Sequence, residues 1–127
     1  METNEPKTTE VSEEVEVSPV ISYDDFAKLE IKVGTITAVD IVEDADRLLR
    51  LTVDVAEDQP RQIVSGIREF FPDPQMLVGK QCPFLTNLAP RKIRGLESQG
   101  MILAAGDGDT FALFHPQSAV PAGTEVH

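Results

Sequence analysis

Apolar and polar residues alternate over several stretches in the middle of the chain, and a period of two predicts β-strands. The first stretch covers residues 29–38, and its phase changes at Gly34. A phase change at a glycine predicts a β-bulge, which would let one long strand bend. The clearest alternation covers residues 49–55, and a third strand is expected over residues 61–65.

Gly66 and two prolines interrupt the pattern after the third strand. Residues 67–71 are expected to form one helical turn that closes one end of the sheet with Ile67. Pro72 and Pro74 prevent a longer helix, because proline cannot be accommodated in a helix interior.

A fourth strand is expected over residues 81–88 and a fifth over residues 96–105, which ends as a nearly unbroken apolar run. Residues 106–109, Gly-Asp-Gly-Asp, are typical of a hairpin turn, so that residues 110–114 would pair back on the fifth strand. The last residues, 116–127, are expected to lie extended against the domain. Together with the apolar residues 110–114, they exceed what a small barrel needs to close, so we expect them to bury the surface of a second copy in a homodimer.

A short helix is predicted over residues 22–29, ahead of the first strand. Ser22 is a good N-cap, and acidic residues follow in the first turn, where the helix dipole favours negative charge. Phe26 is expected to pack inward. Short strands, a bulge in the first and one helical turn between the third and fourth predict an all-β, five-stranded OB-fold barrel. We expect it to carry a short N-terminal helix and a C-terminal dimerisation extension.

The charge of the chain is unevenly distributed around a net value of -11. Residues 1–20 are rich in glutamate and have no sustained period, so we expect a disordered acidic arm or linker, with residues 21–127 as the folded domain. The single cysteine, Cys82, predicts a reducing compartment. There is no secretory signal and no apolar run near the ~18 residues of a membrane span, so a cytoplasmic protein without a membrane partner is expected.

One cationic stretch stands out in this acidic chain: Arg91, Lys92 and Arg94, between Pro90 and Gly95. Such a run taken alone is more often a solvated loop, but here its surroundings are acidic and OB barrels commonly bind oligonucleotides. We therefore predict a basic loop that binds an anion.

The kind of anion follows from what this stretch lacks. Residues 87–105 contain no aromatic side chain on which single-stranded bases would stack, so a folded RNA bound through phosphates and 2'-hydroxyls is the better ligand. His115 and His127 are isolated, and residues 43–46 lack a calcium-loop pattern. We predict no catalytic residue, metal site or cofactor.

Five segments, in order, resemble the tRNA-binding domain family, which includes the C-terminal, beta-subunit-like module of bacterial methionyl-tRNA synthetase and free-standing structure-specific tRNA-binding proteins. The resemblance covers about residues 22–127. The segments are Phe26-Ala-Lys-Leu-Glu-Ile-Lys-Val-Gly34, Ala45-Asp-Arg-Leu-Leu-Arg-Leu51, Arg61-Gln-Ile-Val-Ser-Gly-Ile67, Asn87-Leu-Ala-Pro-Arg-Lys-Ile-Arg-Gly95 and Ser98-Gln-Gly-Met-Ile-Leu-Ala-Ala105.

The resemblance implies an OB fold, a homodimer formed by elements outside the barrel, and recognition of the shape of tRNA at its outer corner. It places nine residues at the tRNA site: the binding-loop residues Asn87, Arg91, Lys92 and Arg94, then Ser98 and Met101 at the start of the fifth strand, with Lys32, Arg50 and Arg61 as weaker candidates on adjoining strands. Ser98 and Met101 are equally compatible with plain strand packing.

Two functions are compatible with this resemblance. The first is tRNA binding as an auxiliary or appended module of methionyl-tRNA synthetase, either free-standing or excised, with a synthetase catalytic chain as a possible partner. The alternative is a secretion-chaperone-like OB-fold dimer that binds polypeptide, which ranks lower because residues 64–67 and 98–101 differ from that branch.

Overall fold

The computed structural model describes residues 18–127, and the predicted acidic arm lies outside these residues as far as residue 17. The division at residue 20 between an arm and a domain stays a prediction. The first described element is the helix α1 (Tyr23–Ala27), which is shorter than expected. Ser22 and Asp25 form a reciprocal capping box at its start, which confirms Ser22 as the N-cap.

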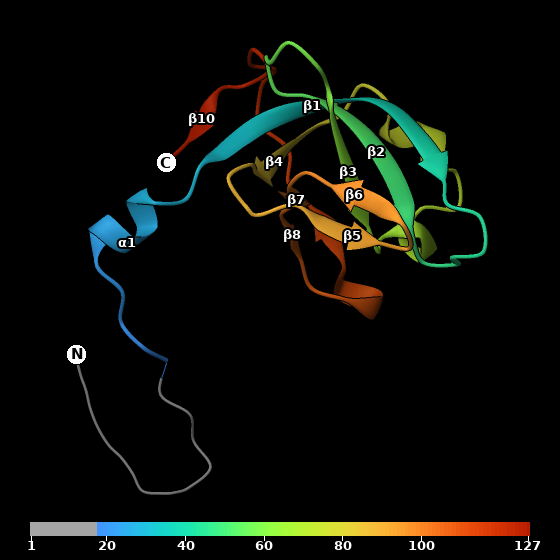
Figure 1. Cartoon of the computed structure of the whole chain (residues 1–127), viewed down its shortest axis with the longest axis horizontal. Coiled ribbons are helices and arrows are strands. Elements are labelled where there is room, and N and C mark those ends of the chain that lie inside the picture. Colours follow the sequence, from blue (N-terminus) through green and yellow to red (C-terminus); the bar gives the residue numbers. More distant parts are fainter. Residues whose placement is uncertain (1–17) are drawn as a thin grey trace, which may run out of the picture.

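Helix α1 lies away from the body of the molecule (Figure 1) and buries none of its residues. The prediction that Phe26 packs into the core is therefore wrong. The ring of Phe26 is half-buried and lies 6.4 Å from the ring of Tyr23. A helix of five residues that buries nothing has little stability of its own, because most helical stability in proteins comes from packing.

The body of the molecule is an antiparallel barrel of five strands, as predicted. Its strand order is β3-β2-β1-β4-β7, and it is built from β1 (Ile31–Ile41), β2 (Leu49–Asp54), β3 (Arg61–Ser65), β4 (Gln81–Leu85) and β7 (Met101–Ile102). The inward positions of these strands form one core of fully buried side chains, with Phe84, Ile36, Leu49, Leu51 and Ile63 among the largest.

The predicted bulge in the first strand exists but lies at a different residue. The register between β1 and β2 shifts between Ile36 and Ala38, so that Thr37 is the inserted residue. Gly34 serves another purpose, because an added Cβ there would lie 2.5 Å from Cγ1 of Val53 and 2.8 Å from Cδ2 of Phe84. The glycine lets β1 approach the core closely.

Two short 3-10 helices connect β3 to β4: η1 (Arg68–Phe70) and η2 (Pro74–Leu77). The first, together with buried Ile67, matches the predicted helical turn. The second was not predicted, although proline is favourable at a first helical position. Leu77 of η2 is 2 % exposed and joins the core cluster.

The expected fifth strand is divided into three short pieces: β6 (Leu96–Ser98), β7 and β8 (Ala104–Ala105). Gly100 separates the first two with a φ of 144°, and an added Cβ would meet the carbonyl oxygen of Leu85 at 2.8 Å. Beyond β8, the turn containing η3 (Gly108–Thr110) leads to β9 (Ala112–Leu113), which pairs back on β8. The predicted hairpin at residues 106–109 is confirmed.

The C-terminal residues lie extended along the barrel, as expected. The backbone N–H of Val33 donates to the carbonyl of Thr124 at 2.8 Å, and the carbonyl of Val33 accepts from the N–H of Gly123 at 2.7 Å. The side chain of Gln81 donates to and accepts from the backbone of Val120. The chain ends in β10 (Glu125–Val126), which pairs with the start of β1. Within residues 18–127, no helix is long and apolar enough to cross a membrane.

Candidate nucleic-acid interface

The cationic stretch is a β-hairpin rather than the loop that the sequence predicted. β5 (Arg91–Ile93) pairs with β6, and Ile93 lies opposite Leu96. The two residues between them, Arg94 and Gly95, have φ angles of 54° and 81°. Two consecutive positive φ values are the signature of a two-residue type I′ turn, whose twist matches that of paired strands.

The hairpin lies across the outside of the barrel, over β3 (Figure 1). Side-chain and backbone hydrogen bonds hold it in this position. The hydroxyl of Ser98 accepts a hydrogen bond from the backbone N–H of Val64 at 3.0 Å and donates one to the carbonyl of Gly100 at 3.0 Å. The backbones of Gln62 and Gln99 are also linked at 2.8 Å. These contacts make the hairpin a rigid mount.

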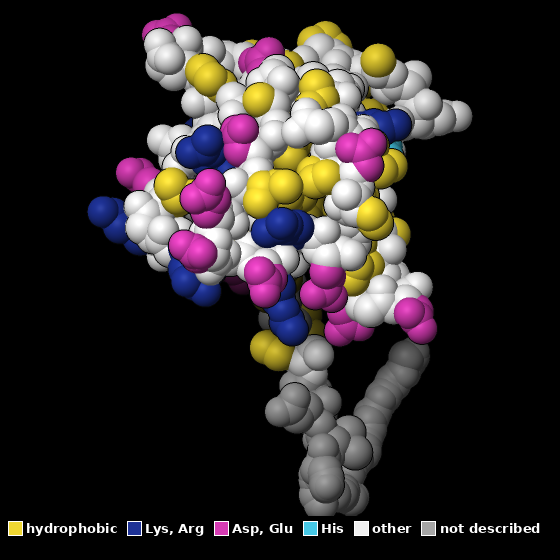
Figure 2. Space-filling view, turned by 90° about the vertical axis from the view of Figure 1, so that its right-hand side faces the viewer, with side chains coloured by type: hydrophobic (Ala, Val, Ile, Leu, Met, Phe, Trp, Pro, Cys, Tyr) yellow, Lys and Arg dark blue, Asp and Glu magenta, His cyan; other side chains and the backbone are white. Residues whose placement is uncertain are grey.

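The three cations of the hairpin are exposed. Ion pairs elsewhere in residues 18–127 involve four other cations, Lys28, Arg47, Arg50 and Arg61, and none involves Arg91, Lys92 or Arg94. On the face shown in Figure 2, cationic side chains lie singly among acidic ones. Three unpaired cations on one rigid element are therefore a distinct feature of this surface.

Arg50 is brought close to the tip of the hairpin. A groove of about 230 Å³ is lined by Arg50 and Arg94 from the two elements, together with Ile41 and Leu96. Arg50 also pairs with Asp40 at 3.3 Å, both being exposed on the outer face of the sheet. Arg50 therefore lies beside the tip of the hairpin, but unlike the hairpin cations it is paired with an acid, and Glu43 also lines the groove.

Arg61 has a different environment from the hairpin cations. Its guanidinium donates to the carbonyl oxygens of Thr86 and Gln99 at 2.6 and 2.9 Å, and two further bonds at 2.9 and 2.8 Å join it to the carboxylate of Glu57. The hydrogen bond from Arg61 lowers the pKa of Glu57, and the charges of Arg61 and Lys32 lower it further. Arg61 is thus held by a bidentate ion pair with Glu57 and by two backbone carbonyls.

Asn87 also makes structural contacts. Its side-chain oxygen accepts from the backbone N–H of Glu30 at 2.8 Å, and its side-chain nitrogen donates to the carbonyl of Lys28 at 2.6 Å. Asn87 thus ties the connection between α1 and β1 to the end of β4. Met101 is 42 % exposed on β7, next to this end of the barrel.

The nine predicted residues therefore fall into groups with different surroundings. Arg91, Lys92, Arg94 and Arg50 present free or surface-paired cations, whereas Arg61, Asn87 and Ser98 are engaged in hydrogen bonds that hold the barrel together. Sequence reasoning missed the ion pair between Glu57 and Arg61. An acid four residues before an arginine, across a turn, could have indicated this pair. Sequence reasoning also missed Gln62 and Gln99, whose contacts span 37 residues and leave no local pattern.

Other kinds of site have little support among the described residues. No group of three His, Cys, Asp or Glu side chains between residues 18 and 127 is placed to hold a metal ion. Burial raises the pKa of the Cys82 thiol to about 11, so it is protonated near neutral pH. The features that remain are a small OB-type barrel and a hairpin that presents cations to solvent. OB-type barrels are a class that commonly binds oligonucleotides through loops and one face.

Comparison with known proteins defines the family. The family model described as "Putative tRNA binding domain" matches residues 31–125, so the chain belongs to this tRNA-binding domain family. The methionine–tRNA ligase of Methanosarcina mazei is 43 % identical over 120 residues, which is 94 % of this chain but 17 % of that protein. The chain thus spans less than a fifth of the length of this relative.

Solved structures show the same barrel. A MetRS related protein from Pyrococcus horikoshii is 34 % identical, with a TM-score of 0.79 over 87 % of this chain and 100 % of that one. The chaperone CsaA from Bacillus anthracis is 24 % identical, with a TM-score of 0.76 over 86 % of this chain and 100 % of that one, a likeness that concerns the fold alone.

The buried hydroxyl of Ser98 leads to a first prediction, which concerns the stability of the barrel. Ser98→Ala leaves the buried N–H of Val64 without its partner, so the free energy of unfolding is expected to fall by about 1–3 kcal/mol. Met101→Ala is the control, because this side chain is exposed and its removal is expected to cost less than about 1 kcal/mol. Urea denaturation measures both. Equal stability of Ser98→Ala and the unmodified protein would contradict the structural role.

Proposed function

We propose that this chain binds tRNA by its overall shape, through phosphate and 2'-hydroxyl contacts, as an auxiliary or appended module of a cytoplasmic methionyl-tRNA synthetase. The observation that carries the proposal is the rigid hairpin with Arg91, Lys92 and Arg94 exposed in a strongly acidic chain of the tRNA-binding domain family. A hairpin of fixed geometry can match phosphates spaced along a folded RNA. It cannot wrap around a flexible single strand as readily.

The proposal is tested by titrating the protein with folded tRNA and with the same tRNA kept unfolded by heating and rapid cooling without magnesium. Folded tRNA is expected to bind at least tenfold more tightly, with affinity that falls steeply as salt concentration rises, because bound cations release counterions from phosphates. Equal affinity for both forms would rule out recognition by shape.

We also propose that two copies of the chain form the functional unit. The residues around α1 expose several large apolar side chains: Val20 is 97 % exposed, Tyr23 76 %, Ile21 61 %, Leu29 45 % and Val126 39 %. A five-residue helix that buries nothing in its own chain gains its packing if a second copy covers it. We therefore propose α1 and β10 as the dimer contact, away from the hairpin.

The expected result is a particle with twice the mass of one chain in sedimentation equilibrium at micromolar concentration. Tyr23→Ser combined with Leu29→Ser should convert it to a monomer. Phe114→Ser, which changes an exposed apolar residue outside this surface, is the control and should leave the dimer intact. A single-chain mass for the unmodified protein at that concentration would refute the dimer.

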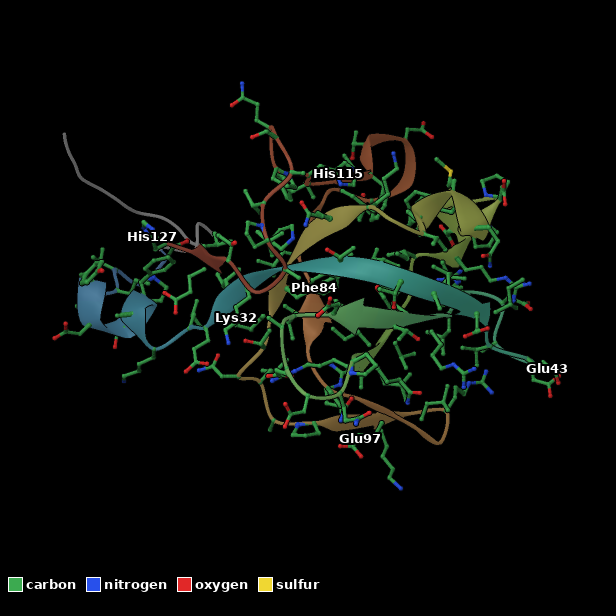
Figure 3. The ribbon with its side chains drawn as sticks, turned by 90° about the horizontal axis from the view of Figure 1, so that it is seen from above. Lys32, Glu43, Phe84, Glu97, His115 and His127 are labelled. Carbon is green, nitrogen blue, oxygen red and sulfur yellow. The ribbon has the colours of Figure 1, made fainter. Side chains whose placement is uncertain are left out.

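Polypeptide binding is a second candidate function, and one cleft favours it. The cleft, of about 390 Å³, lies between η1–η2 and η3–β9 and is lined by the rings of Phe70, Phe71 and Phe111. Figure 3 places His115, at its rim, and Glu97, on the hairpin, on opposite sides of β1. Apolar binding there would not weaken as salt rises, whereas phosphate contacts would, so salt dependence distinguishes the two functions.

A further inference from the structure

A second cleft lies at the base of the cationic hairpin. It has a volume of about 540 Å³ and separates the turn between β2 and β3 (residues 57–60) from the connection between β4 and β5 (residues 88–90). Pro90, which lines it, directly precedes Arg91. A nucleotide whose phosphate lies on the hairpin would therefore have its sugar and base close to this cleft.

One wall of the cleft is the side chain of Arg61. Four hydrogen bonds, to Glu57, Thr86 and Gln99, fix the plane of its guanidinium. A fixed guanidinium plane is a surface on which a nucleobase can stack, as aromatic rings do elsewhere. Its orientation is set before the ligand arrives, so little further side-chain entropy is lost on binding.

The other walls are apolar. Pro60, Leu88 and Pro90 line the cleft, and Leu88 is 37 % exposed. A cleft lined by a guanidinium, two proline rings and a leucine suits a flat heterocycle with an apolar face and a polar edge. Residues 87–105 contain no aromatic side chain. A base that stacks on the guanidinium of Arg61 would not need one.

Acidic groups at the edge of the cleft select against phosphate and favour hydrogen-bond donors. Glu57 already accepts two hydrogen bonds from Arg61. The next residue, Asp58, is exposed and also lines the cleft. Guanine presents two parallel N–H donors, N1–H and N2–H, that match the two oxygens of one carboxylate. Adenine and cytosine present an amino group beside an acceptor, and uracil presents one N–H between two acceptors, so each meets a carboxylate less well.

We propose that this cleft is a subsite for one unpaired guanine base of the bound RNA. The base stacks on Arg61, Asp58 accepts from its N1–H and N2–H, and Arg91 binds its phosphate. The inference rests on the proposed tRNA binding and adds a base-specific contact to recognition by shape.

The first test is a titration of the ¹⁵N-labelled full chain with GMP, AMP, CMP and UMP, followed by NMR. GMP is expected to bind about tenfold more tightly than the others, as a bidentate base contact discriminates, and to shift the signals of Leu88, Gln59 and the Arg61 Nε–H. If all four nucleotides shift only residues 91–94, phosphate binding stands and the guanine subsite is wrong. If tRNA itself shifts neither region, the proposed tRNA binding fails as well.

The second test is Asp58→Asn, with Asp109→Asn as a control for the change of charge. Asp109 is an exposed acid in η3, outside the cleft. Losing one negative charge should by itself strengthen the binding of any nucleotide. Because the lost hydrogen bonds alone carry the discrimination, Asp58→Asn is expected to reduce the preference for GMP to less than about twofold. Asp109→Asn is expected to keep the preference. An unchanged preference in Asp58→Asn would overturn the assignment.

Discussion

Replacing Arg91, Lys92 and Arg94 together by alanine is expected to lower the affinity for tRNA roughly a hundredfold. Each lost contact to a phosphate contributes about 1 kcal/mol, so three contribute about 3 kcal/mol. The slope of log affinity against log salt should become shallower by about two to three units, because each phosphate neutralised adds about 0.7–0.9. All tRNAs should be affected alike, since phosphate contacts carry no sequence information.

The matched control removes three other cations, Lys28, Arg47 and Lys80, which are exposed and lie outside the hairpin. This control variant changes the net charge by the same amount. Its slope of log affinity against log salt should shift by less than about one unit. Neither variant should lose much stability, because the side chains are at the surface. If the hairpin variant binds tRNA with unchanged affinity and slope, the hairpin is only a solvated surface element.

Gly34→Ala is expected to lower the free energy of unfolding by about 1–3 kcal/mol or more. The new methyl group would lie 2.5 Å from Cγ1 of Val53 and 2.8 Å from the ring of Phe84, and both partners are fully buried. A packed core cannot move aside without strain, and this outweighs the gain of about 0.5–1 kcal/mol from replacing glycine in a strand. Guanidinium chloride denaturation measures the change.

Gly66→Ala is the control for this substitution. The nearest atom to its added Cβ, the carbonyl oxygen of Arg47, lies at 3.8 Å, which is an ordinary contact. Its free energy of unfolding should stay within about 0.5 kcal/mol of the unmodified protein. Equal stability of the two variants would mean that β1 does not approach the core as closely as described.

The barrel could be predicted because its strands carry a local signal. In residues 49–54, every second residue is fully buried, and the alternation in the sequence predicts it. The bulge was misplaced because glycine has two uses in a strand: it permits a bulge and it permits close packing. The sequence pattern does not separate them, and here Gly34 serves packing while Thr37 forms the bulge.

The candidate site was predictable in its cations but less so in its geometry. The row from Arg91 to Arg94 is visible in the sequence, whereas the pairing of β5 with β6 depends on positive φ angles at Arg94 as well as Gly95. The engagement of Asn87 could not be foreseen, because its partners lie 57 and 59 residues away in the chain. The carbonyl oxygens of Thr86 and Gln99 that accept from Arg61 could not be foreseen either, because these residues are also distant in the chain.

Hydrogen–deuterium exchange of the full chain, with and without folded tRNA, tests the central claim most directly. Protection is expected over residues 91–98 and the facing strand at Arg50, on the side of the barrel that carries Glu97 (Figure 3). The aromatic cleft at Phe70 and Phe111 should exchange as in the free protein. Protection confined to that cleft, with the hairpin unchanged, would contradict the account.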